Sequence, residues 1–317
     1  TVINHMSAEN FLYEGSTISG IQLRDTLHNK IYEVRSKTVI NATGVFADDL
    51  ILKDNPAHHR IVTPSQGIHL VVDKQYHNTP YAMLIPKTTD GRILFAVPWH
   101  DKVVIGTTDT TATDISEEPQ ATNEEIHFVL DNFNRYINTQ LTSSDIKSVF
   151  TGLRPLVKMK NIQSTADLVR DHTIVVSPSG LVTITGGKWT TYRKMARDVI
   201  NKAIRSGNLP FRRCRTRSIK LIIGKKITTQ ESSELLHHDF PFTKADIIYA
   251  IHHEMACTLE DILARRIRLL FLDVRIALEV APQVCRLLQK ELGHDELWYD
   301  SQLTIFRTLA KQYLPKG

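Results

Sequence analysis

Hydrophobic and polar residues alternate through much of the first 110 residues, and a period of two predicts β-strands. Between residues 15 and 44 the alternation predicts a hairpin with its turn at 25–29. A buried strand follows and ends at Ala42-Thr43-Gly44. Between residues 61 and 110 it predicts four further strands, with Asp90-Gly91 as a tight turn between two of them. We place these strands at 67–72, 81–85, 93–97 and 103–107.

Beyond residue 120 the spacing of apolar residues alternates between the helical and the extended pattern. Residues 123–138 are predicted to form a helix, and residues 149–153 and 181–185 to form strands. A second helix is predicted at 189–205, with its apolar residues facing a core. The chain up to this point is therefore predicted to be a mixture of helix and sheet.

The last third of the chain has a different composition. Residues 206–245 are polar and irregular, whereas residues 247–314 predict a nearly continuous helical module. Within this module we predict that Pro282 lies in the first turn of a helix and that Gly293 is a C-cap. The change in pattern predicts a domain boundary near residue 215.

The most informative segment is Gly186-Gly187-Lys188-Trp189-Thr190, where a predicted strand meets a predicted helix. A strand that ends at two glycines and opens a helix directs backbone N–H groups outward, and the helix dipole favours negative charge there. Lys188 adds a mobile cation and Thr190 adds a hydroxyl. The segment is suited to an anion, either a phosphate or the negative charge of a reduced flavin ring. An ordinary strand-to-helix turn is the alternative.

Composition and charge narrow the class of protein. Of the 317 residues, 42% are hydrophobic and 23% are charged, which is typical of a globular protein. No apolar run approaches the roughly 18 residues that span a bilayer, and no signal-peptide pattern opens the chain. The net charge is +5, with five basic residues between 212 and 220. We expect a solvated linker or face there, with contact to anionic lipid headgroups as the alternative. Nucleic acid is disfavoured because no aromatic residues interleave with these charges.

Cysteine and histidine usage argues against a disulfide or metal framework. Cys214, Cys257 and Cys285 are far apart and odd in number, which predicts a reducing compartment and unpaired thiols. Adjacent histidines do not share a helix face, and no cysteine or carboxylate cluster completes a ligand set, so we predict no metal site. The adjacent pairs are His58-His59, His237-His238 and His252-His253.

Four motifs stand in a fixed order along the chain: Asn41-Ala42-Thr43-Gly44, Gly152-Leu153-Arg154-Pro155, Arg170-Asp171-His172 and Gly186-Gly187-Lys188. Together they resemble the FAD-dependent glycerol-3-phosphate dehydrogenases, and the likeness runs from Thr1 to the C-terminus. The resemblance implies an α/β (α+β) fold: a partial FAD-binding fold with an antiparallel substrate-binding sheet over residues 1–214. An all-helical C-terminal cap domain over residues 215–317 would follow. FAD is the implied cofactor.

The dinucleotide fingerprint G-x-G-x-x-G does not occur in the sequence, although the family carries it near its own N-terminus. We therefore expect the chain to be a C-terminal fragment that lacks roughly the first third of the enzyme and is inactive alone. A complete protein of another kind that shares the later motifs is the alternative.

The resemblance implies an activity and its partners. The reaction would be oxidation of sn-glycerol 3-phosphate to dihydroxyacetone phosphate, with hydride transfer to FAD and electrons passed to quinone. An oxidase that passes electrons to oxygen and a catalytically silent binding module of the same fold are the alternatives. The expected location is the cytoplasm, peripheral on the inner face of the cytoplasmic membrane, or the mitochondrial inner membrane in a eukaryote. A homodimer is left open.

Site residues follow partly from the resemblance and partly from their chemistry. By resemblance, Arg154 and Arg170 line the substrate pocket and Lys188 lies near substrate and flavin. Arginine suits phosphate because it binds in a bidentate fork. His69 is our candidate general base, because imidazole titrates near neutral pH and the ring faces away from Ile68, Leu70 and Val72 on its strand. A structural histidine is the alternative. Arg154 is the rival catalytic group, because a guanidinium can stabilise an alkoxide. The expected cofactor-binding residues are Ala42, Thr43, Gly44, Gly186, Gly187, Lys188, Trp189 and Thr190.

Overall fold

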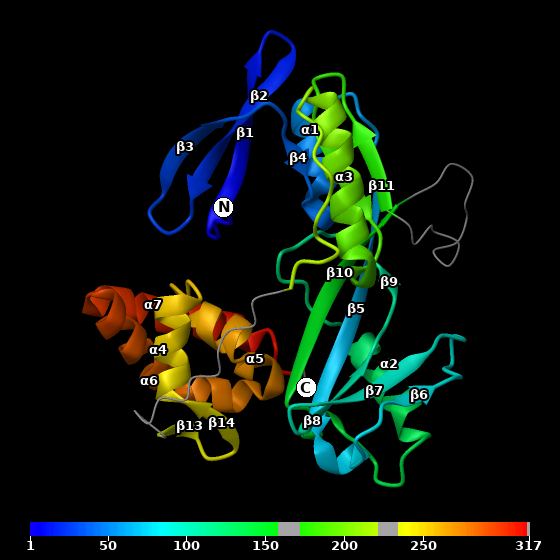
Figure 1. Ribbon diagram of the computed structural model, residues 1–317. Coiled ribbons are helices and arrows are strands. Elements are labelled where there is room, and N and C mark those ends of the chain that lie inside the picture. The colour runs from blue at the N-terminus through cyan, green and yellow to red at the C-terminus, as the bar shows by residue number, and fades with distance from the viewer. Residues whose placement is uncertain (158–171, 221–233, 316–317) are drawn as a thin grey trace. The chain divides into compact units, whose positions relative to one another are not determined.

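The structure is a computed structural model that describes residues 1–157, 172–220 and 234–315 (Figure 1). The chain divides into two compact units, each built from separated stretches of sequence. Unit 1 comprises Thr1–Gln66, Thr110–Glu117 and Leu153–Leu221, and unit 2 comprises Gly67–Asp109, Glu118–Gly152 and Ile222–Gly317. The mixed helix-and-sheet class predicted from the sequence is confirmed. The domain boundary near residue 215 stays a prediction.

An antiparallel sheet of three strands opens unit 1: β1 (Met6–Glu14), β2 (Thr17–Asp25) and β3 (Lys30–Arg35). The predicted turn at 25–29 joins β2 to β3, so the predicted hairpin is confirmed. The Asp25 carboxylate fixes this turn by accepting hydrogen bonds from the amides of Leu27 and His28. β1 is not predicted, because polar residues interrupt its hydrophobic alternation.

The second sheet of unit 1 has the strand order β11-β12-β4. β11 (His172–Val176) and β12 (Val182–Gly186) are antiparallel, and the short β4 (Ile40–Asn41) is parallel to β12. After β12 the chain forms a 3-10 turn, η5 (Trp189–Thr191), and then helix α3 (Tyr192–Ser206), which packs on the sheet through Val199 and Ala203. The predicted strand 181–185 and helix 189–205 are thus confirmed. A 3-10 turn, η1 (Gly44–Phe46), and helix α1 (Ala47–Asp54) follow β4.

A larger sheet has the strand order β10-β5-β8-β7-β6. β5 pairs antiparallel with β8, β8 with β7, and β7 with β6. These pairings confirm the four strands predicted between residues 61 and 110. One face packs on helix α2 (Asn123–Asn134), which begins at a capping box made by Thr122 and Glu125. The strands are β5 (Val62–Asp73), β6 (Met83–Ile85), β7 (Leu94–Trp99), β8 (Lys102–Gly106) and β10 (Ser148–Val157). A further short strand, β9 (Thr110–Thr111), also pairs with β5. The connections contain two 3-10 turns, η2 (Lys74–His77) and η3 (Ser143–Asp145).

The C-terminal part of unit 2 is helical, as predicted, and it begins with a hairpin of β13 (Leu235–His237) and β14 (Phe240–Thr243) that is not predicted. Gly293 has a φ of 72° at the end of α6, which confirms the predicted C-cap. The prediction for Pro282 is wrong, because this residue lies in the interior of α6, whose first turn is capped instead by the Asp273 carboxylate. The helices are α4 (Lys244–His253), the π-helix η6 (Asp261–Arg266), α5 (Leu269–Leu272), α6 (Val274–Leu292) and α7 (Glu296–Lys311).

Backbone and charge contacts within unit 2 join the start of β10 to the helices. The Val149 amide donates to the Tyr313 carbonyl at 2.8 Å, and the Val274 amide donates to the Lys147 carbonyl at 3.2 Å. The Lys147 ammonium lies 3.0 Å from the Asp73 carboxylate at the end of β5. Partial burial raises the pKa of Asp73, but hydrogen bonds from Lys102 and Lys147 outweigh it and hold the pKa below its usual value. The sheet and the helices of unit 2 therefore share one packed structure.

None of the helices within the described ranges combines the length and the apolar character needed to cross a bilayer.

The three cysteines lie in different environments, which predicts an order of reactivity. Burial raises the pKa of Cys285 to about 11, and it also raises the pKa of Cys257. A hydrogen bond with Thr216 lowers the pKa of the exposed Cys214. Because the thiolate is the reactive form, iodoacetamide at pH 8 should alkylate Cys214 first and Cys285 only after unfolding. Mass spectrometry of timed samples measures this order, and rapid labelling of Cys285 in the folded chain would contradict it.

Candidate functional site

Two strands of unit 1 end side by side and define the candidate site. β4 and β12 pair in parallel register, with Ile40 opposite Val182 and Asn41 opposite Thr183. Their carboxyl ends therefore meet at one edge of the sheet, the position where open α/β sheets bind ligands. Ala42-Thr43-Gly44 leaves one strand at this edge, and Gly186-Gly187 leaves the other. The Thr185 hydroxyl reaches the Gly44 carbonyl at 3.5 Å and joins the two exits.

Asn41 holds this edge together, although it is absent from the predicted site. Its side chain is buried at 1% exposure, and its amide nitrogen donates to the Ala47 carbonyl at 2.9 Å and to the Thr183 hydroxyl at 3.3 Å. Its carbonyl oxygen accepts a hydrogen bond from the Thr43 hydroxyl at 2.8 Å and from the Thr43 amide at 3.3 Å. This is an Asx turn. The sequence signal for it is an asparagine placed two residues before a strand-ending Thr-Gly.

The two glycines after β12 are required by the backbone. Gly186 and Gly187 have φ values of 77° and 78°, a region that only glycine enters without strain. A Cβ on Gly187 would also lie 2.6 Å from the Met195 sulfur of α3. The chain can therefore turn sharply and pass close to the helix that follows.

The next residues present hydrogen-bond donors and positive charge. The Thr191 hydroxyl accepts from the Lys188 amide and donates to the Lys188 carbonyl, which closes the turn. In the part of the chain that the structure describes, the amides of Trp189 and Thr190 donate to no other group, as is usual at the start of a helix. Lys188 is exposed, and Arg193 follows in the first turn of α3. This arrangement favours an anion.

Trp189 presents an aromatic surface beside these amides. Its side chain is 85% exposed, and its ring stacks on Tyr192 with centroids 5.4 Å apart. All eight residues predicted to bind the cofactor thus lie on the two chain exits at one sheet edge. Their role in binding stays a prediction.

Of the two predicted arginines, only Arg154 lies among the residues that the structure describes. Arg154 lies on β10, half-buried, among the residues of unit 1. Arg170 lies outside the described residues.

His172, from the same tripeptide, opens β11 opposite Gly186, and its ring lies 3.2 Å from the Asp198 carboxylate of α3. Hydrogen bonds from Lys194 and Arg197 lower the pKa of Asp198, so a carboxylate anchors the far side of this turn.

His69 belongs to unit 2. It pairs with Gly106, which pairs with Phe95, which pairs with Leu84, so these residues form one row across the sheet. Ile68 and Leu70 point to the core on the opposite face, as predicted. Leu84 and Phe95 are 52% and 45% exposed, so the row presents an apolar surface.

A chain of aromatic rings supports His69 within unit 2. The His69 ring stacks on Phe150 with centroids 4.9 Å apart and planes 15° from parallel. Phe150 meets Phe271 edge-on, and Phe271 meets Tyr313 edge-on. Gly106 gives the imidazole room, because a Cβ there would lie 2.6 Å from the His69 ring. The orientation of His69 is therefore set by packing.

Comparison with known proteins gives matches along nearly the whole chain. Residues 7–193 match the family described as FAD dependent oxidoreductase, and residues 214–297 match the C-terminal domain of alpha-glycerophosphate oxidase. The mitochondrial glycerol-3-phosphate dehydrogenase of Homo sapiens is 34% identical over 92% of this chain and 46% of its own length. The Arabidopsis thaliana protein of that name is 31% identical, with 93% and 55% covered. The chain thus spans about half the length of the curated relatives it matches.

A solved structure is similar over almost the entire chain. The glycerol-3-phosphate dehydrogenase of Bacillus halodurans, solved in complex with FAD, superimposes with a TM-score of 0.81 at 25% identity. The match covers 98% of this chain and 69% of that one. The resemblance stated from the four motifs is therefore confirmed.

Substitution of two glycines with similar backbone angles separates backbone strain from crowding. Gly187→Ala and Gly180→Ala both place a side chain at positive φ, at 78° and 93°, but Gly180 has open space around it. We expect Gly187→Ala to cost about 1 kcal/mol more, at the low end of overpacking costs because the Met195 thioether can move. Urea unfolding of both variants measures this difference, and equal losses would argue against the close contact.

The stacking of His69 on Phe150 can be tested by NMR. In Phe150→Leu the ring current over the imidazole is lost, so the His69 ring protons should move downfield. The variant should also lose about 1 kcal/mol of stacking. Phe242→Leu is the matched control, because Phe242 stacks on Phe240 within the hairpin instead. If both variants leave the His69 signals unchanged, the rings are not stacked in solution.

Proposed function

The chain belongs to the FAD-dependent oxidoreductase family, and we propose that it is the substrate-side part of a glycerol-3-phosphate dehydrogenase. The reaction is oxidation of sn-glycerol 3-phosphate to dihydroxyacetone phosphate. The observation that carries the proposal is the 34% identity to a glycerol-3-phosphate dehydrogenase over 92% of the chain. The anion-favouring edge of β4 and β12 supports it, because the substrate and a reduced flavin are both anionic.

The residues at this edge fit the flavin ring of FAD. Two positive-φ glycines let the backbone approach a flat group closely, and the amides of Trp189 and Thr190 are available to acceptors on its rim. The printed sequence contains no G-x-G-x-x-G loop of the kind that binds a pyrophosphate. Bound FAD supplies the acceptor for the hydride that leaves the substrate.

The chain's own groups divide the remaining work. The amides at the start of η5 and the Lys188 ammonium stabilise negative charge as it develops, which lowers the barrier. Arg154 and Arg170 hold the phosphate of the substrate, since guanidinium groups bind phosphate oxygens in pairs. His69 takes the proton of the C2 hydroxyl at an imidazole nitrogen. Arg154 is the alternative group at this step, acting by electrostatic stabilisation of the alkoxide.

Two electron acceptors are compatible with these residues. Quinone is our proposal, because the curated relatives carry the name dehydrogenase. Oxygen is the second candidate, because residues 214–297 match a domain named after an oxidase. Hydrogen peroxide release on addition of glycerol 3-phosphate in air distinguishes oxygen from quinone. A fold retained without turnover would give neither product nor peroxide.

We also propose peripheral contact with an anionic membrane, on the inner face of the cytoplasmic membrane or on the mitochondrial inner membrane. The stretch 212–220 supports this contact, because all of its residues are exposed and five of them are basic.

The boundary between an FAD- and substrate-binding domain and a helical cap domain is proposed near residue 215, and the second matched domain begins at residue 214.

The function is tested with the protein in the form in which the cell makes it. Purified protein should show a flavin absorption band and should reduce a dye when glycerol 3-phosphate is added. In Lys188→Met, flavin reduction in a single turnover should slow about tenfold, equivalent to about 1.4 kcal/mol of lost stabilisation. Lys194→Met is the control, because it removes the same charge from a lysine that pairs with Asp198 at 2.9 Å.

Two results would refute parts of this proposal. Protein that carries no flavin and reduces no dye would remove the enzymatic function. Equal single-turnover rates in Lys188→Met and the unmodified protein would remove the role of Lys188 and leave the function standing.

A further inference from the structure

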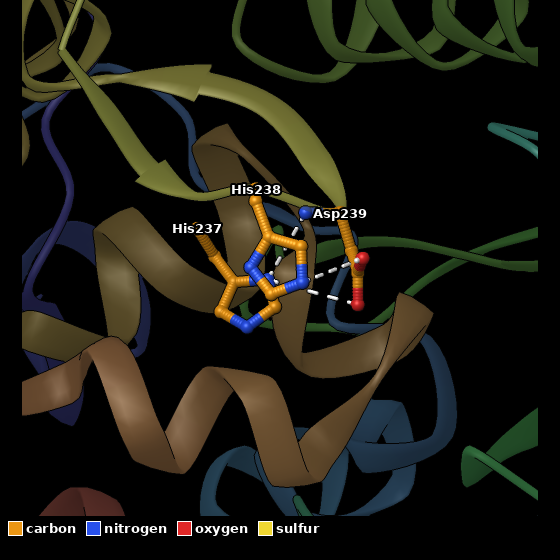
Figure 2. A group of neighbouring side chains, drawn as sticks. All are labelled: His237, His238 and Asp239. Atoms are coloured by element: carbon orange, nitrogen blue, oxygen red, sulfur yellow. Dashed lines mark hydrogen bonds and ion pairs between the residues drawn. The ribbon is translucent and has the colours of Figure 1, made fainter.

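The turn of the β13–β14 hairpin brings three metal-ligating side chains together. His237, His238 and Asp239 offer two imidazoles and a carboxylate whose donor atoms all lie within 4.8 Å of one another (Figure 2). Among the residues that the structure describes, no other three histidine, cysteine or acidic side chains converge in this way. We propose that this turn binds a divalent transition-metal ion of the Zn²⁺ class.

The prediction of no metal site rests on helix geometry and on the lack of a cysteine or carboxylate cluster to complete a ligand set. Neither reason holds here, because the two histidines are not helical and Asp239 adds a carboxylate. Adjacent residues on a helix point about 100° apart, as is expected for His252-His253 at the end of α4. His237 and His238 instead occupy a strand end and a tight turn, and their rings stack with centroids 4.3 Å apart. The turn thus directs both imidazoles to the same side.

Hydrogen bonding selects the tautomer of His237 that a metal needs. The Asp239 amide donates to His237 Nδ1 at 3.1 Å, so Nδ1 carries a lone pair and the ring proton of the neutral imidazole is on Nε2. His237 Nε2 faces the Glu279 carboxylate of α6 at 3.8 Å. A carboxylate behind the far nitrogen of a ligating histidine is a recurrent feature of protein metal sites, because it orients the ring and raises its basicity.

The three donors differ in mobility in a way that suits binding. His237 is 11% exposed and held in place, whereas His238 and Asp239 are 83% and 54% exposed and already lie 3.2 Å from each other. Their side chains can close the remaining gap around an ion with little rearrangement. Binding would replace the hydrogen bond from the Asp239 amide to Nδ1, and that amide lies in an exposed turn where water can accept its hydrogen bond instead.

The donor set also indicates which ions bind. Imidazole nitrogens suit Zn²⁺, Co²⁺, Ni²⁺ and Cu²⁺, whereas Mg²⁺ and Ca²⁺ require oxygen ligands. Three protein ligands leave coordination positions for water. A bound ion would connect the hairpin more firmly to α6 through His237 and Glu279, and would stabilise the helical part of unit 2.

The test is a titration of the full polypeptide with Co²⁺, read by its visible absorption, followed by displacement with Zn²⁺. A Cys214→Ser background is used, because the exposed thiol is a metal ligand in its own right. We expect one saturable site that Mg²⁺ does not occupy, together with a rise in the thermal unfolding midpoint. His238→Gln and Asp239→Asn should each weaken binding at least about tenfold, and Glu279→Gln by about 10- to 100-fold.

His28→Gln is the matched control. His28 is also an exposed histidine beside a carboxylate, at 2.8 Å from Asp25, but within the described ranges no third ligating side chain joins this pair. Its substitution should leave the affinity unchanged. Absence of a saturable site, or equal affinities in His238→Gln and His28→Gln, would overturn the proposal. Neither outcome depends on flavin or on turnover, so the proposed function is tested separately.

Discussion

The candidate site of unit 1 depends on the hydrogen bonds of one buried side chain, that of Asn41. Its amide bonds to α1, to β12 and to the turn that follows β4, so one residue fixes three segments. β4 itself is only two residues long and contributes few ladder bonds. The parallel pairing that brings the two chain exits together therefore rests largely on this buried polar network, in which every partner is satisfied.

The same edge combines rigidity with exposure. Asn41 and Thr185 are buried, whereas the residues that follow them, Thr43 and Lys188, are exposed. Packed strands thus position backbone donors and a cation that remain accessible to a ligand. In unit 2 the arrangement is similar in principle, because the aromatic rings of Phe150 and Phe271 hold His69 on a face that stays partly open. In unit 1 buried polar groups, and in unit 2 partly buried aromatic rings, set the orientation of an accessible polar group.

Local patterns in the sequence predict much of this structure. Alternation of period two located the strands around His69 and the face on which it lies, because side-chain direction in a strand follows from position alone. Contacts between distant residues are not encoded in such patterns. The bond from Asn41 to Thr183 and the stacking of Phe150 on His69 therefore appear only in the folded chain. The position of Pro282 was mispredicted for a related reason. The cap at Asp273 and tertiary packing support a helix that continues through this residue, although proline by itself disfavours a helix interior.

The discontinuity of unit 1 has a consequence for biosynthesis. Asn41 and Thr183 are separated by 142 positions, and much of unit 2 is encoded between them. At the translation rates typical of cells, the interval between the synthesis of β4 and that of β12 is roughly 7–28 s. During this interval the strand has no parallel partner within the described residues of unit 1. The candidate site of unit 1 can therefore form only after residues 182–186 have been synthesised, so its assembly follows that of the chain between the two strands.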